Sequence, residues 1–148
     1  MNSFIKNPLV QGYINSNNFG ELLGMNFEII SPGDIVYTML VTESHLATPI
    51  AAHGGSISAL MDAAMGVCAL SQVLADNRVV STIELKISFI SPGFLGDQLI
   101  ATTSVVKAGK RLLFVEGKIV NQTGKLIASA TGTFNSYPAE KAGFSQRV

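Results

Sequence analysis

Cysteine is nearly absent from this sequence, and runs of like charge are absent. Cys68 is the only cysteine, which excludes an internal disulfide and a cysteine-rich metal site. A lone cysteine in an apolar stretch is most often a small buried hydrophobic residue. The chain has only two histidines, His45 and His53, which are too few to build a metal site together with this single cysteine. The sequence therefore favours chemistry that needs no metal ion and no redox cofactor.

Charge is sparse and balanced. The ten basic and ten acidic residues are scattered along the chain, and the formal net charge is zero. A nucleic-acid or anionic-membrane partner would require a basic patch, which this sequence lacks. Charged residues make up 14% of the chain and hydrophobic residues 47%, against roughly 25% charged residues in ordinary soluble domains. We expect part of this apolar surface to meet another subunit.

No N-terminal stretch is apolar enough for a secretory signal. Polar residues and a proline interrupt the opening segment MNSFIKNPLVQGYINSNN, which predicts a cytosolic protein. The longest apolar stretch, residues 54–75, contains an aspartate, and its many alanines and glycines contribute little transfer energy toward a membrane. A buried helix of a soluble protein is the better interpretation.

Length and continuity predict one domain. The 148 residues contain no repeat, low-complexity tract or Pro/Ser-rich linker. We expect a single domain over residues 1–148, with a core from about 22 to 136 and a peripheral N-terminal segment. For the tail, residues 137–148, disorder and packing on a partner both remain open.

Periodicity predicts six strands and one long helix. A helical turn at residues 19–24 comes first. The strands are then expected at residues 25–30, 35–42, 79–90, 98–106, 111–120 and 126–134, with the helix between the second and third. On the third strand, Ile83, Leu85, Ile87 and Phe89 share the apolar face. Short turns join successive strands, so the predicted class is α+β with an antiparallel sheet.

The helix has almost no polar face. One side is formed by Ile57, Leu60, Met61, Ala64, Val67, Cys68 and Ser71. The opposite side shows Ser58, Ala59, Met65, Gly66, Ala69 and Val73 instead of lysine or glutamate. Small residues at alternate positions of the last strand, among them Gly132, leave room for a helix to pack closely, so the sheet should curl around it. We expect the helix to be buried by its own sheet and by a second copy of the protein.

Asp62 is the only ionised side chain in HGGSISALMDAAMG, residues 53–66. Burial disfavours the charged form of a carboxylate unless a partner compensates. Such a group either makes a structural hydrogen bond or salt bridge with the sheet, or serves as a base or nucleophile in a cleft. The pattern alone leaves both interpretations open.

Gly54 and Gly55 begin this helix. A helix N-terminus offers unpaired N–H groups, and glycine permits close approach, so this site can bind an anion or a developing oxyanion. Eight positions separate Gly54 from Asp62, roughly 12 Å at a rise of 1.5 Å per residue. One carbonyl cannot contact both within one chain. If both act on one bond, the active unit is at least a two-fold dimer.

Three motifs stand together in this sequence: His-Gly-Gly at residues 53–55, Asp62 eight positions after the first glycine, and the strand STIELKISFISPG at residues 81–93. Together they resemble the hotdog-fold acyl-CoA thioesterases, in particular the phenylacetate-pathway-like subgroup. The similarity covers about residues 22–134. It implies a sheet wrapped around one central helix, with protomers joined edge to edge as dimers or dimers of dimers and active sites at the protomer interface.

By this resemblance the chain hydrolyses acyl-CoA thioesters, with coenzyme A as part of the substrate and no separate cofactor. Asp62 matches the family's general base or nucleophile, and Gly54 matches its oxyanion-hole N–H. His53 matches the histidine that positions the thioester, with Gly55 as a further substrate-binding position. Thr82 matches the hydroxyl that orients the water or the carboxylate.

One position departs from the family pattern. An asparagine often lies six residues before this histidine, and here that residue is Ala47; Thr48 would replace it if the loop shifts by one residue. Lys107, Lys110 and Arg111 flank a turn near where relatives hold the nucleotide. They are either phosphate-binding cations or a solubilising hairpin tip.

Two other functions remain open. A non-catalytic acyl-CoA binding module is compatible with Ala47. A hotdog hydratase or dehydratase also uses a histidine and a helix carboxylate, although at a different motif spacing. The acyl-chain preference depends on the depth of the pocket, which the sequence does not specify.

Overall fold

The computed structural model describes residues 3–144, so the last four residues of the predicted tail, 145–148, lie outside the description. The helices are α1 (Pro8–Ser16), α2 (Asn18–Leu22) and α3 (Gly54–Val73). The strands are β1 (Met25–Ser31), β2 (Asp34–Leu40), β3 (Arg78–Phe89), β4 (Gln98–Ala108), β5 (Leu112–Val120) and β6 (Leu126–Pro138). A 3₁₀ turn, η4 (Ala139–Ala142), follows β6.

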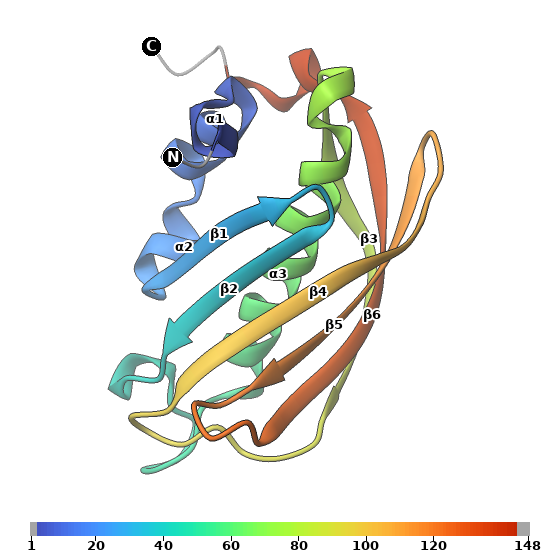
Figure 1. The fold of residues 1–148 in the computed structure, drawn as a ribbon. Coiled ribbons are helices and arrows are strands. Elements are labelled where there is room, and N and C mark those ends of the chain that lie inside the picture. The colour runs from blue at the N-terminus through green and yellow to red at the C-terminus, as the bar shows by residue number, and fades with distance from the viewer. Residues whose placement is uncertain (1–2, 145–148) are drawn as a thin grey trace.

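The strands form one antiparallel sheet in the order β1-β2-β4-β5-β6-β3. The sheet curves around α3, which lies on its concave side (Figure 1). β1 and β3 are the outer strands, and β3 pairs only with β6. The predicted α+β class and the wrapped central helix are therefore confirmed.

The predicted apolar side of α3 is buried against this sheet. All seven residues of that side are inaccessible or nearly so. Two glycines of the sheet allow the close approach. A Cβ on Gly132 would lie 2.8 Å from Met65 Cε, and one on Gly117 would lie 2.9 Å from Met61 Sδ. The small residue predicted at position 132 is thus needed for packing, and Gly117 on β5 adds a second such position.

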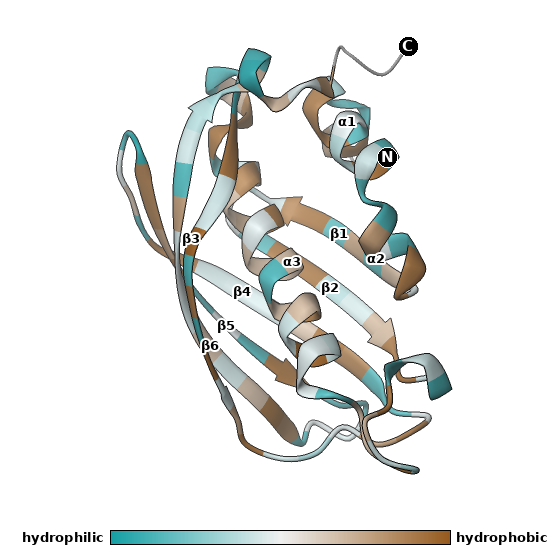
Figure 2. Cartoon of the chain, turned by 180° about the vertical axis from the view of Figure 1, so that it is seen from behind, coloured by the Kyte–Doolittle hydropathy of each residue, from teal (hydrophilic) through white to brown (hydrophobic). Residues whose placement is uncertain are grey.

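The opposite side of α3 is only partly open. Met65, which the pattern placed on this side, packs instead on Gly132 of the sheet. Ala69 and Val73, which we expected a second copy to cover, are buried within the chain itself. Ser58 and Gly66 remain partly exposed. This open side lies between β3 and the N-terminal helices (Figure 2). The helical span from residue 54 to 76 is long and apolar enough to cross a membrane. However, 67% of its most apolar 18-residue stretch is buried inside the fold.

The periodicity of the sequence did not predict α1, although Asn7-Pro8 is a typical helix start, and this helix forms a wall beside the open side of α3. The Asn7 side chain caps it by accepting from Leu9 N–H at 2.9 Å, and Pro8 occupies the first helical position. Val10 is fully buried, and Gly12 lies against the Phe144 ring. A nine-residue helix is marginal in isolation, so these tertiary contacts hold it.

The alternation predicted for β3 is wrong at one of its four apolar positions, Ile83. Ile83 is 57% exposed and Phe89 is 53% exposed. The pairing with β6 skips Ile83 between Thr82 and Glu84, which makes Ile83 the extra residue of a β-bulge. Phe89 stays on the predicted face, opposite Ala128 of β6, and is exposed because it ends an outer strand that has no neighbour on its free edge. The last strand, β6, also runs four residues beyond its prediction.

Candidate active site

Asp62 lies in the middle of α3 and is half-buried on the open side. The Thr82 hydroxyl, from the neighbouring strand β3, donates to Asp62 Oδ1 at 2.7 Å. Among residues 3–144 it is the only hydrogen-bond partner of this carboxylate, and it is not a cation. Oδ2 therefore remains free to accept from a water molecule or a ligand.

A cavity of about 290 Å³ opens beside this pair. One wall is formed by α3, the start of β3 and the end of β6. The other is formed by α1, the segment around α2, and Phe144. Asp62 is the only charged residue among its described lining residues. A largely apolar pocket with a few polar groups suits a small organic acyl group.

Two polar side chains of this cavity, Tyr13 and Asn17, and the buried Tyr37 behind them were not predicted. The Tyr13 and Tyr37 hydroxyls lie 3.0 Å apart, and Asn17 Nδ2 donates to the Tyr37 hydroxyl at 3.1 Å. Desolvation, the neighbouring Tyr37 and, to a smaller extent, the charge of Asp62 raise the pKa of Tyr13, so its hydroxyl stays protonated. No sequence signal joins these residues, because they belong to segments far apart in the chain.

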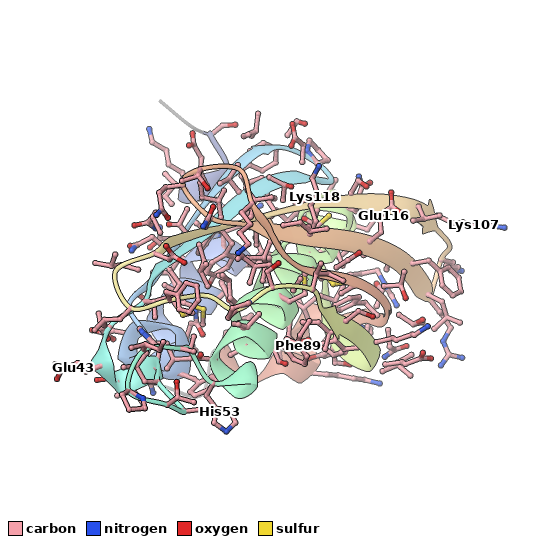
Figure 3. All side chains as sticks on the ribbon, turned by 90° about the horizontal axis from the view of Figure 1, so that it is seen from below. Glu43, His53, Phe89, Lys107, Glu116 and Lys118 are labelled. Carbon is pink, nitrogen blue, oxygen red and sulfur yellow. The ribbon has the colours of Figure 1, made fainter. Side chains whose placement is uncertain are left out.

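The N-terminus of α3 forms a second set of groups. His53 is the N-cap, and its Nδ1 accepts from Gly55 N–H at 2.7 Å. The neutral ring therefore carries its proton on Nε2, on a side chain that points outward where α3 begins (Figure 3). Gly54 N–H has no acceptor among the residues that the structure describes. Gly54 and His53 thus offer two free donors, whereas the N–H of Gly55 is already used.

Gly54 and Asp62 face different hollows. Gly54 lies in a groove of about 410 Å³ together with Phe89 and Ile90, and this groove does not include Asp62. A Cβ on Gly54 would lie 3.3 Å from the Phe89 ring. Conversely, Gly54 is not part of the cavity that contains Asp62. One chain therefore presents the two predicted halves of the site in separate places.

The loop before α3 keeps its polar groups for its own structure. Ala47 and Thr48 are exposed, and Thr48 Oγ1 accepts from Ala51 N–H at 3.0 Å. His45 is buried, with Nδ1 accepting from Thr42 N–H at 2.9 Å. Its Nε2 lies 2.8 Å from the Leu23 carbonyl oxygen and donates to it. His45 is thus a structural histidine, and the loop supplies no side chain equivalent to an asparagine at position 47.

The three predicted phosphate-binding cations lie at the tip of the β4–β5 hairpin. Lys107, Lys110 and Arg111 are all exposed. The hairpin tip lies toward the C-terminal end of α3 (Figure 1), and Lys107 is far from His53 in the view of Figure 3. Within one chain these cations are not brought to Gly54.

Known proteins share both this sequence and this fold. The sequence profile of the thioesterase superfamily matches residues 51–128. Acyl-coenzyme A thioesterase PaaI of Escherichia coli (strain K12) is 36% identical over 110 residues, which are 74% of this chain and 76% of that protein. Acyl-coenzyme A thioesterase 13 of Homo sapiens is 29% identical over 127 residues, 84% of this chain and 89% of that protein.

Solved structures agree with these similarities. The E. coli PaaI protein from the phenylacetic acid degradation operon has a TM-score of 0.80 at 29% identity, and the match covers 86% of this chain and 90% of that one. The smu.793 protein of Streptococcus mutans UA159, solved bound to acetyl CoA, has a TM-score of 0.70 at 25% identity, with 77% and 89% covered. The curved sheet and its central helix are the hotdog fold. The chain belongs to the thioesterase superfamily.

Proposed function

We propose that this protein hydrolyses acyl-CoA thioesters to the free acid and coenzyme A. The observation that carries the proposal is a carboxylate, Asp62, held by one hydroxyl in an otherwise uncharged cavity. The relatives named as acyl-CoA thioesterases and the acetyl CoA complex of the Streptococcus mutans neighbour support this substrate class.

The proposed reaction assigns a role to each free group. Asp62 Oδ2 accepts a proton from water, and the water oxygen attacks the thioester carbonyl carbon. Gly54 N–H and His53 Nε2–H stabilise the oxyanion that forms. The C–S bond then breaks, and the coenzyme A thiolate takes up the proton held by Asp62. Direct attack by Asp62, followed by hydrolysis of the resulting anhydride, is the alternative route.

The proposed site needs two protomers, because Asp62 and Gly54 face separate hollows. β3 offers the means of joining them, since it is an outer strand with an unpaired edge and large exposed apolar side chains. Gly54 packs on Phe89, and Asp62 is bonded to Thr82. Any pairing that sets position 82 of one strand opposite position 89 of its partner therefore also brings the two half-sites together.

Two β3 strands can pair antiparallel about a two-fold axis that passes between Leu85 and Lys86. Residues 82 and 89 are equally far from this axis, so it sets residue 82 of one strand opposite residue 89 of the other. Each dimer would then contain two identical composite sites. We include in this proposal a dimer, or a dimer of dimers, as the active form. Lys107, Lys110 and Arg111 would in turn bind the coenzyme A phosphates. These cations would belong to a different protomer from the one that supplies Gly54.

The first experiment measures thiol release from a panel of acyl-CoAs by the purified protein. The panel covers short, long and aromatic acyl groups. Release that saturates with substrate is the expected result. Tight binding of acyl-CoA without any release would contradict hydrolysis and support a non-catalytic binding module.

Mixed dimers test whether the site is shared. Asp62→Asn removes the base, and Gly54→Pro removes the N–H donor at a helical position that proline tolerates well. Each variant alone should be nearly inactive. Refolding the two together should restore activity, because half of the sites in a mixed dimer then contain neither substitution.

Gly54→Ala is the matched control, because it adds a Cβ near Phe89 but keeps the N–H. It should retain far more activity than Gly54→Pro. If mixing restores nothing although mass measurements show mixed dimers, both groups would have to act within one chain, and the shared site would be wrong.

A further inference from the structure

Two polar side chains of the cavity beside Asp62, Tyr13 and Asn17, are connected through the buried Tyr37, and the proposed reaction uses none of the three. Asn17 Nδ2 donates to the Tyr37 hydroxyl, which lies 3.0 Å from the Tyr13 hydroxyl. Asn17 and Tyr13 line the cavity, whereas Tyr37 has no exposed surface. We call these three residues the tyrosine relay.

The direction of the hydrogen bond between the two tyrosines follows from counting donors. If Tyr13 donated, Tyr37 would accept from both Asn17 and Tyr13, and its own buried proton would have no acceptor among residues 3–144. Leaving a buried donor unpaired is costly. If Tyr37 donates instead, the only hydroxyl proton of the three residues left over belongs to Tyr13, at the cavity wall, beside the second amide proton of Asn17. The relay therefore runs from Asn17 through Tyr37 to Tyr13.

Aromatic packing holds Tyr13 in this position. Its ring meets Phe27 edge to face with centroids 5.6 Å apart, and Phe27 stacks on Tyr37 at 5.2 Å. On the other side of α1, a Cβ on Gly12 would lie 2.9 Å from the Phe144 ring, so the helix itself is fixed. A donor fixed before binding loses little conformational freedom when a ligand arrives.

We propose that Tyr13 is a specificity-determining residue whose hydroxyl donates a hydrogen bond to an oxygen on the acyl group, remote from the thioester carbonyl. The proposal rests on the proposed function, which places the acyl group in this cavity. Acyl groups that carry an oxo, methoxy or hydroxy substituent are then preferred to hydrocarbon groups of the same skeleton. Because Tyr13 is the donor, oxygens that only accept are recognised as well as hydroxyls.

The test compares pairs of acyl-CoAs with one carbon skeleton, one member carrying a single remote oxo or methoxy group. The measured quantity is the ratio of kcat/KM within each pair. One neutral hydrogen bond predicts a ratio of about 3 to 10 in favour of the oxygenated member for the wild type. Tyr13→Phe keeps the ring and its packing but should bring the ratio close to 1.

Two further variants locate the effect. Tyr137→Phe removes another hydroxyl from the lining of the same cavity, outside the relay, and should keep the wild-type ratio. Tyr37→Phe should also keep it, because Tyr13 retains its proton. Unfolding curves for all three variants identify any loss of fold. If the preference for the oxygenated member disappears in Tyr137→Phe but persists in Tyr13→Phe, the contact belongs to Tyr137 and the proposal is overturned.

Failure of this proposal is distinguishable from failure of the hydrolase function. Normal hydrolysis with a wild-type ratio near 1 overturns the role of Tyr13 alone. A ratio near 1 that rises in Tyr37→Phe would show that Tyr13 donates to Tyr37, which also overturns it. If no thioester is cleaved, calorimetry with matched pairs of non-hydrolysable acyl-CoA thioethers measures the same ratio as an affinity difference and still decides the role of Tyr13.

Discussion

The sheet-facing side and the open side of α3 belong to one helix but are packed under different constraints. On the sheet-facing side, Met61 and Met65 fill the space above Gly117 and Gly132, where not even a Cβ would fit without a shift. On the open side, Asp62 faces a cavity and has a single hydroxyl as its partner. The first side stabilises the fold through close packing, whereas the second keeps space and unused hydrogen-bonding capacity for a ligand. Substitutions on the two sides should therefore affect different measurements.

The largest effect is expected for Asp62→Asn on the open side. Removing the base should lower kcat by about 100- to 10,000-fold, while the free energy of unfolding changes little because Asp62 makes one partly exposed hydrogen bond. Steady-state kinetics and denaturant unfolding measure the two quantities. Asp76→Asn, an exposed carboxylate just beyond the helix, is the control and should leave both unchanged. Equal turnover in both variants would remove Asp62 from the mechanism.

On the sheet-facing side, Gly132→Val should act on stability first. Even a Cβ there would lie 2.8 Å from Met65 Cε and 3.1 Å from the Glu84 carbonyl oxygen. We expect a loss of about 3 kcal/mol in the free energy of unfolding, from overpacking.

Gly66→Ala on the open side is the matched comparison for that variant. Its Cβ would meet only Phe134, at an ordinary 3.7 Å, and alanine is favoured over glycine inside a helix by about 1 kcal/mol. The two variants should therefore shift the denaturation midpoint in opposite directions. A shift of the same sign would mean that the two sides of α3 are packed alike.

Thr82→Val tests how the carboxylate is oriented. Valine has nearly the shape of threonine but cannot donate to Asp62 Oδ1, so kcat should fall by about 10-fold, the effect of one hydrogen bond worth roughly 1.4 kcal/mol. Thr82→Ser keeps the hydroxyl and should retain most of the activity. If serine and valine are equally impaired, the methyl group rather than the hydroxyl is what matters at this position.

The smallest effect concerns Asp97, a carboxylate whose surroundings contrast with those of Asp62. Burial disfavours its ionised form, but hydrogen bonds from Phe94 N–H at 2.8 Å and the Gln122 amide at 2.9 Å outweigh burial. The pKa of Asp97 is therefore lowered. A lowered pKa stabilises the fold above the ordinary carboxyl pKa of about 4, and this contribution is lost as the pH falls through the folded-state value.

The free energy of unfolding, measured from pH 6 down to pH 3, should therefore decrease more steeply in the wild type than in Asp97→Asn. The two curves should approach each other at the acidic end. Parallel curves would mean that Asp97 contributes no pH-dependent stability.

Sequence periodicity predicted the architecture well. The alternating strands, the apolar helix and the small residue at 132 all depend on local patterns that follow directly from the geometry of strands and helices. The proximity of Asp62 and Thr82 was predicted from the family resemblance and is found in the structure. Their catalytic roles remain a prediction.

Other features depend on neighbours that lie far along the chain. The bulge at Ile83 is set by the pairing of β3 with β6, so alternation alone assigned that residue to the wrong face. α1 lacks a strong helical pattern, and burial of Val10 holds it. The contact between Tyr13 and Tyr37 joins residues 24 positions apart. A pattern that repeats every two or four residues contains no information about such contacts.

The sequence by itself determined that α3 is apolar nearly all round, that one carboxylate interrupts it, and that its first residues lie too far from that carboxylate to share a bond with it in one chain. These results need only the rise and period of a helix. The tertiary structure alone decided which side of the helix stays open, where the cavity lies, and which polar side chains line its wall. Those properties arise only when separate strands and the N-terminal helix pack around α3, because each is a relation between segments and not a property of any one of them.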